Sequence, residues 1–405
     1  MKYFWIIIFI CILLPESLFG INVEGRVIDE KYFPVPFITV SASSGQTAKT
    51  DKNGNFLLKD LKTPYKLFLY DFSNSTGIVY NDLSISKPEL IFFGYNSSKD
   101  INTEILKVEF PQMGPGKSAI LKFISDKIFY CKDSYISSGE KIKHLVVEWP
   151  STANSITGRV IIIEKTQTKY LKYREKTVSV IKDFYPQTVI FDSLTYSSEL
   201  GNSFLTLYLP STEADRKGFS VYGDFLSMHR NAEILLDSTL GNIFTIKVPV
   251  PLNLPFGFRL KVSGFSYNKY NSGFVTYDYS YPNSIVNLTS EEPPVLLAPQ
   301  DRYYWVNNST IFSYERGSGS GVFVVNFHCF DPAGDFYIVT QDIDIRFPMN
   351  ISNGILSGVE YSWQVNKYLS FTSVNDFVRE RKFVNDIGYN AILYSEMRTF
   401  RTKPY

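Results

Sequence analysis

Apolar and polar residues alternate along most of this chain, in short runs that end at turn residues. Runs such as VEGRVID, YKLFLYD, SFLTLYLP and FRLKVSGF place every second side chain on one face, which is the two-residue period of a β-strand. Gly, Pro, Asn, Asp and Ser separate the runs, as expected for strands joined by tight turns. The pattern predicts an all-β protein made of tandem β-sandwich domains. Residues 374–386 differ, because Val374, Phe377 and Val378 fall at helical spacing and indicate a short amphipathic helix.

Polar and Pro-rich stretches divide the chain into blocks of strands. We expect a β-sandwich over residues 21–95, two β-rich domains of unassigned family over 103–181 and 189–289, and a last β-sandwich over 293–403. The two middle blocks are also consistent with one larger unit. Domains of about 100 to 150 residues are the commonest size, so a chain of this length suits three or four of them.

The first 20 residues have the pattern of a secretory signal peptide. Lys2 precedes an almost unbroken apolar run from Tyr3 to Leu14, and Pro15 and small or polar residues follow. The run is shorter than the about 20 apolar residues that a membrane-spanning helix needs. We therefore expect an exported protein of the periplasm or cell surface, with no integral membrane span after cleavage of residues 1–20. An uncleaved anchor is the alternative.

Charge and cysteine usage exclude some classes of protein. The formal net charge is +1 and Lys and Arg are scattered, whereas nucleic-acid binding needs a clustered basic face. Beyond the apolar run only Cys131 and Cys329 remain, in different blocks, so a disulfide framework does not hold the fold together. The sequence leaves open whether the two are buried thiols or form a bond across a domain contact.

The stretch TDKNGNFLLKDL, residues 50–61, invites comparison with a calcium loop. Counted from Asp51, an EF-hand loop requires Gly at its sixth position and Glu at its twelfth, where this chain has Phe56 and Lys62. Asn53 and Gly54 fit instead the two central positions of a type I′ hairpin turn, which need positive φ. The sequence therefore predicts a hairpin here, with TAKT and FLLKDL as its paired strands.

Residues 23–71 also carry motifs of a known family. They resemble the carboxypeptidase regulatory-like domain, and the resemblance extends over about the first seventy-five residues after position 20. The matching positions of the G-x-V-x-D opening, the Pro step and the T-D-x-x-G-x-F motif are Gly25, Val27, Asp29, Pro36, Thr50, Asp51, Gly54 and Phe56. The resemblance implies a transthyretin-like β-sandwich of the carbohydrate-binding-like folds. The chain departs from the family at Phe37, where the family usually has Gly.

Residues 293–402 resemble a fibronectin type III or related immunoglobulin-like module. The resemblance depends on the Pro-rich start, on the strand GVEYSWQV with Tyr361 and Trp363, and on the closing strand MRTF. It implies a sandwich of about seven short strands. The chain departs from the module by an insertion over residues 366–394, which we interpret as a recognition loop or, alternatively, as a disordered or packing insertion.

The sequence predicts no catalytic, cofactor or metal site. A zinc carboxypeptidase needs H-x-x-E, but the Glu residues after His144 and His229 each lie one position too far, and His328 has none nearby. On a strand, His144 and Glu148 share a face, while Leu145 and Val147 form the opposite, buried row. The GPGKS stretch, residues 114–118, lacks the first Gly of a phosphate loop and predicts a turn.

Clusters of aromatic residues are a second candidate binding feature. Tyr303, Tyr304 and Trp305 in RYYWV are candidate ligand-binding residues, because flat rings stack on sugars. The alternative is that such rings fill sandwich cores. We interpret the chain as a non-catalytic adhesion or scaffolding protein of a bacterial envelope, whose partner is an envelope protein or a polysaccharide. Carbohydrate binding is the second interpretation, and an envelope hydrolase is the third.

Overall fold

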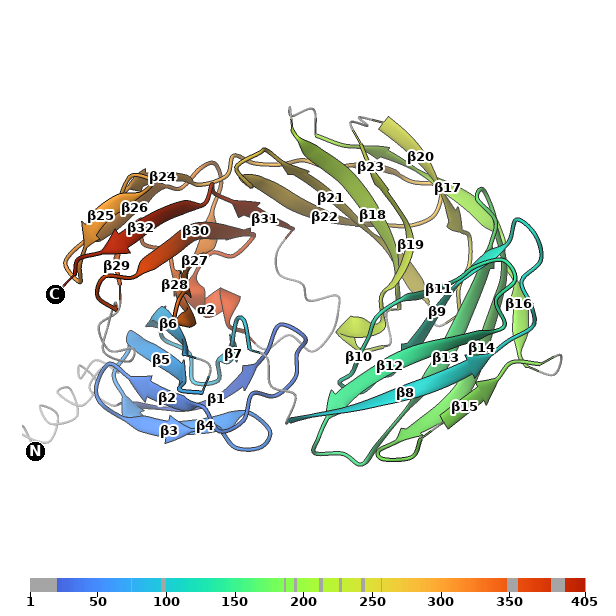
Figure 1. The fold of residues 1–405 in the computed structure, drawn as a ribbon, viewed down its shortest axis with the longest axis horizontal. Coiled ribbons are helices and arrows are strands. Elements are labelled where there is room, and N and C mark those ends of the chain that lie inside the picture. The colour runs from blue at the N-terminus through green and yellow to red at the C-terminus, as the bar shows by residue number, and fades with distance from the viewer. Residues whose placement is uncertain are drawn as a thin grey trace, which may run out of the picture.

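The computed structural model describes residues 20–73, 75–95, 100–185, 187–192, 195–210, 214–225, 228–241, 245–255, 257–347, 356–379 and 390–404. The expected signal segment lies outside them, except for Gly20. Almost every regular element is a β-strand, so the all-β prediction is confirmed. In the described residues no helix is long and apolar enough to cross a membrane. Figure 1 shows four groups of strands arranged around a ring; we call them units 1 to 4 in chain order.

Unit 1 is a two-layer sandwich. Its strands are β1 (Ile21–Ile28), β2 (Thr39–Ala42), β3 (Thr47–Lys49), β4 (Asn55–Leu61), β5 (Tyr65–Asp71), β6 (Thr76–Leu83) and β7 (Glu89–Ile91). One sheet has the order β4-β1-β7, and the other contains β6-β5-β2-β3. The alternate apolar residues of β4 and β5 point into the core between the sheets, as their two-residue period predicts.

Units 2 and 3 share one hydrophobic core. Unit 2 contains β8 (Ile101–Glu109), β9 (Ser118–Ile124), β10 (Tyr130–Cys131), β11 (Ser134–Ile136), β12 (Ile142–Pro150), β13 (Ser155–Lys165), β14 (Tyr170–Ile181), β15 (Gln187–Ile190) and β16 (Ser197–Glu199). Unit 3 contains β17 (Asn202–Tyr208), β18 (Arg216–Phe225), the 3-10 turn η3 (Arg230–Ala232), β19 (Ile234–Leu240), β20 (Thr245–Pro251), β21 (Phe258–Tyr267), β22 (Gly273–Ser280) and β23 (Ile285–Asn287). The division of this stretch into two domains or one larger unit stays a prediction.

Unit 4 completes the ring. Its elements are β24 (Val295–Ala298), β25 (Tyr303–Val306), β26 (Ile311–Glu315), β27 (Gly321–Phe330), β28 (Ala333–Thr340), β29 (Asp344–Arg346), β30 (Glu360–Leu369), α2 (Val374–Phe377), β31 (Ala391–Tyr394) and β32 (Arg398–Thr402). The sheet β24-β26-β29 packs over β28, β27, β30 and β32 around a core rich in aromatic rings. Tyr361 and Trp363 are both buried in that core.

Backbone pairing runs from unit to unit. A fourteen-stranded sheet has the path β19-β18-β21-β22-β31-β30-β27-β28-β6-β5-β2-β3, with β32 and β25 as a branch. Strand β22 of unit 3 pairs with β31 of unit 4, and β28 of unit 4 pairs in parallel with β6 of unit 1. Unit 1 therefore lies beside unit 4 (Figure 1), and the two are joined by main-chain hydrogen bonds.

Residues 371–379 of the predicted insertion pack against unit 1, whereas its two ends belong to β30 and β31. A short helix does form there as α2, and Val374, Phe377 and Val378 are buried in the core of unit 1. The side chain of Asn375 forms two hydrogen bonds. Its Nδ2 donates to the backbone oxygen of Asp82 at 3.2 Å, and its Oδ1 accepts from the backbone N–H of Ser84 at 2.6 Å. The packing interpretation thus applies to residues 371–379. The helix is shorter than predicted, because it ends at Phe377 and Arg379 forms a β-bridge with Pro88. Residues 380–386 of the predicted helix lie outside the described residues.

The predicted hairpin at Asn53 and Gly54 is wrong. Strand β3 pairs with β2 and strand β4 pairs with β1, so the turn carries the chain from one sheet of unit 1 to the other. Of the two turn residues, Gly54 has positive φ, at 79°, and Asn53 does not. A Cβ atom at position 54 would lie 2.3 Å from the carbonyl oxygen of Val27. Glycine is required because β1 passes so close. The carboxylate of Asp51 accepts hydrogen bonds from the N–H groups of Asn53 and Asn55, as in an ordinary turn.

Two further details concern Phe37 and the cysteines. Phe37 has a φ of 62°, so the step after Pro36 takes the left-handed conformation that glycine adopts most easily. Its side chain is exposed. Cys131 and Cys329 are both free and buried, which answers the question that the sequence left open. Burial raises the pKa of the Cys131 thiol to about 11, so the thiol is protonated at neutral pH.

Candidate functional site

The three aromatic residues selected from the sequence form an exposed row on β25. The side chains of Tyr303, Tyr304 and Trp305 are 46%, 59% and 60% exposed. In a regular strand one of three neighbours would point inward. Here the register with β32 shifts between Tyr304 and Val306, so Trp305 sits in a bulge and Val306 is the residue that enters the core.

The bulge holds Trp305 in an unusual backbone conformation. Its φ is 80°, which costs an L-residue about 1 to 2 kcal/mol relative to ordinary backbone. Hydrogen bonds on both sides fix the strand, from Arg302 N to Thr399 O at 2.7 Å and from Lys403 N to Val306 O at 2.9 Å. Strand β25 pairs with β32 alone, so its other edge is unpaired among the described strands. The backbone of the row is therefore fixed, and its three rings are exposed.

The histidines lie apart from one another. His144 is exposed on β12, with Leu145 and Val147 buried on the opposite face as predicted, and Glu148 pairs with Lys31 at 3.0 Å. On β27, His328 Nδ1 lies 2.7 Å from an Asp335 carboxylate oxygen, while Cys329 points into the core. No group of three His, Cys, Asp or Glu side chains that suits a metal ion occurs in the described ranges.

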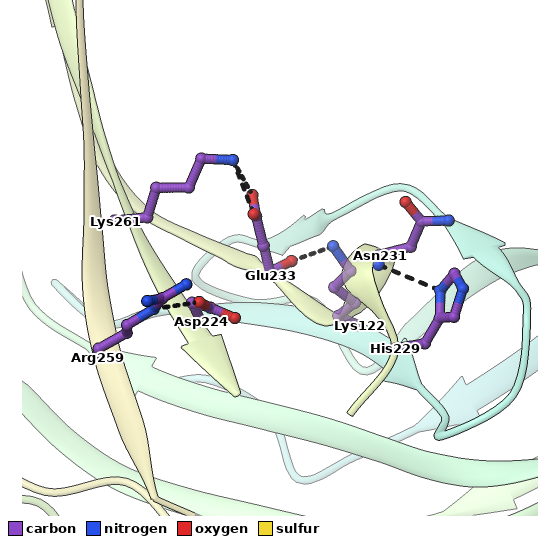
Figure 2. A network of polar contacts seen from close by, with 7 residues as sticks. All are labelled: Lys122, Asp224, His229, Asn231, Glu233, Arg259 and Lys261. Atoms are coloured by element: carbon purple, nitrogen blue, oxygen red, sulfur yellow. Dashed lines mark hydrogen bonds and ion pairs between the residues drawn. The ribbon is translucent and has the colours of Figure 1, made fainter. Parts of the chain in front are cut away.

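A network of charged residues at the junction of units 2 and 3 was not predicted. Figure 2 shows Lys122 of β9 pointing to the backbone oxygen of Glu233, to which it donates a hydrogen bond. Lys122 also pairs with Asp133 at 3.3 Å, and Glu233 pairs with Lys261 of β21 at 2.7 Å. These side chains are largely buried, so each charge depends on its partner.

The pair of Asp224 and Arg259 is the most buried part of this network. Asp224 on β18 is fully buried, and its Oδ2 accepts a hydrogen bond from Arg259 Nε at 2.7 Å (Figure 2). The guanidinium of Arg259 lies over the ring of Tyr279 at 3.5 Å. Burial raises the pKa of the Asp224 carboxyl, although Arg259 opposes the shift. Asp224 Oδ1 and Arg259 Nη2 are buried and have no hydrogen-bond partner among the described residues.

The turn η3 extends the junction to unit 1. The side-chain amide of Asn231 donates hydrogen bonds to the carbonyl oxygens of Lys31 in unit 1 and Phe129 in unit 2. The His229 ring lies edge-to-face with Tyr32 and accepts a hydrogen bond from Asn231 N. Three units thus meet at one turn. We use the name polar junction for this turn together with the network of charged residues described above, most of which Figure 2 draws.

The side chains of the polar junction form a structural contact between units. Its charged side chains are Lys122, Arg259 and Lys261 against Asp133, Asp224 and Glu233, so the charges balance. Balanced, buried pairs fix the relative placement of the strands that carry them. One weak signal for it in the sequence is the cluster of polar residues in HRNAE between two apolar runs, which resembles an incomplete zinc motif.

Comparison with known proteins gives no family for this chain. No family model matches it, and no curated protein matches it significantly. Among solved structures, a Bacillus anthracis TIE protein matches at 9% identity and a TM-score of 0.16, over 66% of this chain and 49% of that one. The chain thus spans about half the length of that protein.

Two further solved structures match at similar levels. The major pilin subunit BcpA of Bacillus cereus matches at 10% identity and a TM-score of 0.15, over 67% of this chain and 98% of that chain. A calcium-stabilised adhesin with which an Antarctic bacterium binds ice matches at 9% identity and a TM-score of 0.16, over 95% of this chain and 100% of that chain. TM-scores this low establish no common overall arrangement.

Proposed function

We propose that this chain is a non-catalytic, exported protein of a bacterial cell envelope that acts in adhesion or as a scaffold. The observation that carries the proposal is the way in which the units are joined. Units 2 and 3 share a core, and main-chain pairing links unit 3 to unit 4 and unit 4 to unit 1. A ring joined in this way is a stiff frame, and it holds the aromatic row of β25 at a fixed place on its surface.

The layer orders support the family assignments that belong to this proposal. In unit 1, β4-β1-β7 against β6-β5-β2-β3 suits a transthyretin-like, carboxypeptidase regulatory-like sandwich. In unit 4, β24-β26-β29 against β28-β27-β30-β32 is a three-on-four arrangement, as in a fibronectin type III module. Both kinds of sandwich serve commonly as supports whose edges and loops carry the binding residues.

The exposure of the aromatic row favours a second candidate function, the binding of a polysaccharide. Aromatic side chains have few rotatable bonds, so exposed rings on a fixed backbone lose little conformational freedom when a ligand stacks on them. The apolar faces of sugar rings fit such a surface, and the hydroxyl groups of the tyrosines supply hydrogen bonds at its rim. The ligand would be an extended glycan, because β25 offers exposed rings along the length of a strand.

An adhesion assay tests the first function. Beads coated with the mature protein should adhere to isolated cell envelopes, and the variant Tyr303→Ser/Tyr304→Ser/Trp305→Ser should adhere about tenfold less, the loss expected when the central rings of an interface are removed. The matched control is Tyr270→Ser/Tyr281→Ser, which removes two exposed rings of unit 3 and should leave adhesion unchanged. Equal adhesion of all three proteins would contradict the proposal.

Competition separates the two candidates. Free envelope polysaccharide added to the same assay should abolish adhesion if β25 binds sugar. Protease treatment of the envelopes should abolish it if the partner is a protein. Direct retention on a glycan array, lost in the triple variant and kept in the control variant, would establish carbohydrate as the ligand.

A further inference from the structure

A groove separates unit 1 from the outer sheet of unit 4. It has a volume of about 540 Å³ and lies where β6 and β28 pair. Its floor is formed by Phe68 of β5, Val79 of β6 and Ile338 of β28, and β29 forms one wall. The outer sheet of unit 4 ends at β29, so the face of β5 beyond it carries no second layer of described strands.

The wall of the groove is the free edge of a strand. Tyr314 N donates to Ile343 O at 3.1 Å, and the register places Phe312 opposite Ile345. Hydrogen-bonded pairs alternate in an antiparallel ladder, so the backbone N–H and C=O groups of Asp344 and Arg346 point away from β26. They have no hydrogen-bond partner within the described ranges. A further strand placed about 4.8 Å from β29 would lie over the floor of the groove.

A buried side chain of the groove also has an unused hydrogen-bonding atom. Asn81 of β6 is 8% exposed, and its Nδ2 donates to Thr340 Oγ1 at 3.2 Å. Its Oδ1 is buried and has no partner among the described residues. A buried acceptor of this kind is destabilising unless a donor reaches it. The N–H groups of a peptide backbone are such donors.

The charges around the groove are also unpaired. Lys66, Asp342, Asp344 and Arg346 line it, and none of them forms an ion pair with another described residue. A short edge strand with charged residues is one way in which proteins prevent edge-to-edge aggregation. That role alone leaves the buried Asn81 oxygen and the apolar floor without a function. Two cations and two anions complement an extended segment that carries both signs of charge.

We infer that this groove binds an extended polypeptide segment of a partner protein, which adds as a strand to the free edge of β29. The partner strand would pair with the backbone of Asp344 and Arg346, as in other cases of β-strand addition. Its alternate apolar side chains would cover Phe68 and Val79, and its outer residues would pair with the charges of the rim. The inference is independent of the aromatic row on β25 and goes beyond the proposed function.

Two substitutions at one position test the inference. Arg346→Pro removes an N–H group that faces away from β26, so it blocks strand addition and leaves the existing ladder in place. Arg346→Ala removes the same side chain and keeps the N–H group. A phage-displayed library of linear peptides should yield segments with alternating apolar residues. These should bind Arg346→Pro at least about tenfold more weakly than the wild type, and Arg346→Ala within about threefold of it.

Hydrogen exchange of the unmodified protein is the second measurement. The amides of Asp344 and Arg346 should exchange fast in the free protein and become protected when a selected peptide binds. Circular dichroism and the unfolding midpoint check that Arg346→Pro is folded. Equal losses in both variants, unprotected amides, or the absence of enriched peptides would overturn the inference. Binding of a soluble oligosaccharide that both variants and Asp344→Ala abolish would overturn it in favour of a sugar site.

Discussion

The contact between units 1 and 4 and the polar junction of units 1, 2 and 3 join the same ring by different means. The first contact is formed by strand pairing between β6 and β28, together with the packing of the apolar residues of α2. Buried charges and the side chain of Asn231 hold the second (Figure 2). Apolar packing tolerates changes in pH and salt, whereas buried charges are costly as soon as one partner is lost. The apolar contact therefore supplies strength, and the polar junction fixes one placement of the units.

The largest effect is expected from Asp224→Ala. It leaves the guanidinium of Arg259 buried without its carboxylate, which should lower the free energy of unfolding by about 4 kcal/mol. Urea unfolding at pH 7 measures the change. The double variant Asp224→Leu/Arg259→Met replaces the pair by apolar side chains and should recover most of the loss. A double variant as unstable as the single one would show that packing, and not charge, governs this part of the polar junction.

A smaller loss should follow from Phe377→Ala in α2. The ring of Phe377 packs edge-to-face on Tyr368 and Phe371 at 5.3 and 5.0 Å, so its removal should cost about 3 kcal/mol. Because no charge is involved, the loss in free energy of unfolding should be the same at pH 5 and pH 8, unlike the loss caused by Asp224→Ala. Hydrogen exchange should also speed up in β6 and β7, where α2 docks. The exposed ring of Phe330 provides the control, because Phe330→Ala should change neither quantity.

The smallest effect concerns Asp29, whose turn presents Lys31 and Tyr32 to the polar junction. Burial raises the pKa of Asp29 to about 6, although the N–H groups of Phe33 and Lys31 donate to its carboxylate. Between pH 4 and 6 the Asp29 carboxyl has therefore lost its proton in the unfolded chain but keeps it in the folded protein. The contribution of Asp29 to the free energy of unfolding is therefore full below pH 4 and is lost as pH rises from 4 to 6, by about 2 kcal/mol. Asp29→Asn should abolish this loss.

Asp51 is the matched control for Asp29. Its carboxylate accepts hydrogen bonds from the N–H groups two and four residues later, as that of Asp29 does, but it is exposed. Its slight burial is outweighed by the hydrogen bonds from Asn55 and Asn53, which lower its pKa. Asp51→Asn should therefore destabilise the protein at neutral pH and have less effect in acid. Parallel pH profiles of urea unfolding for the two variants decide whether burial sets the sign.

The sequence predicted what depends on local pattern. Alternation in YKLFLYD and SFLTLYLP identified strands, and helical spacing of Val374 and Phe377 identified α2. Periodicity in a single sequence does not decide whether Tyr303 and Trp305 lie on the surface or in the core, because a bulge interrupts β25. The role of the row in binding stays a prediction.

Contacts between distant segments could not be predicted in the same way. Asn and Gly at positions 53 and 54 suit a hairpin locally, but β1 and β2 compete for the flanking strands and separate them into two sheets. The partners of Asp224 and Lys122 lie on other strands, so no short spacing marks them. Exposed and buried charges look alike in a sequence, and only the packing of β9, β18 and β21 distinguishes them.

The parallel pairing of β6 with β28 sets an order on the folding of the chain. Asn81 and Thr340, which form a hydrogen bond across this pairing, are 259 positions apart in sequence. Unit 1 is synthesised first, yet the edge of β6 and part of its core receive their partners only when β28 and α2 have been made. During synthesis the edge of β6 therefore stays unpaired until the last part of the chain has been made. Ring closure is thus a late and slow step, and any helper that shields nascent chains would act on β6 during that interval.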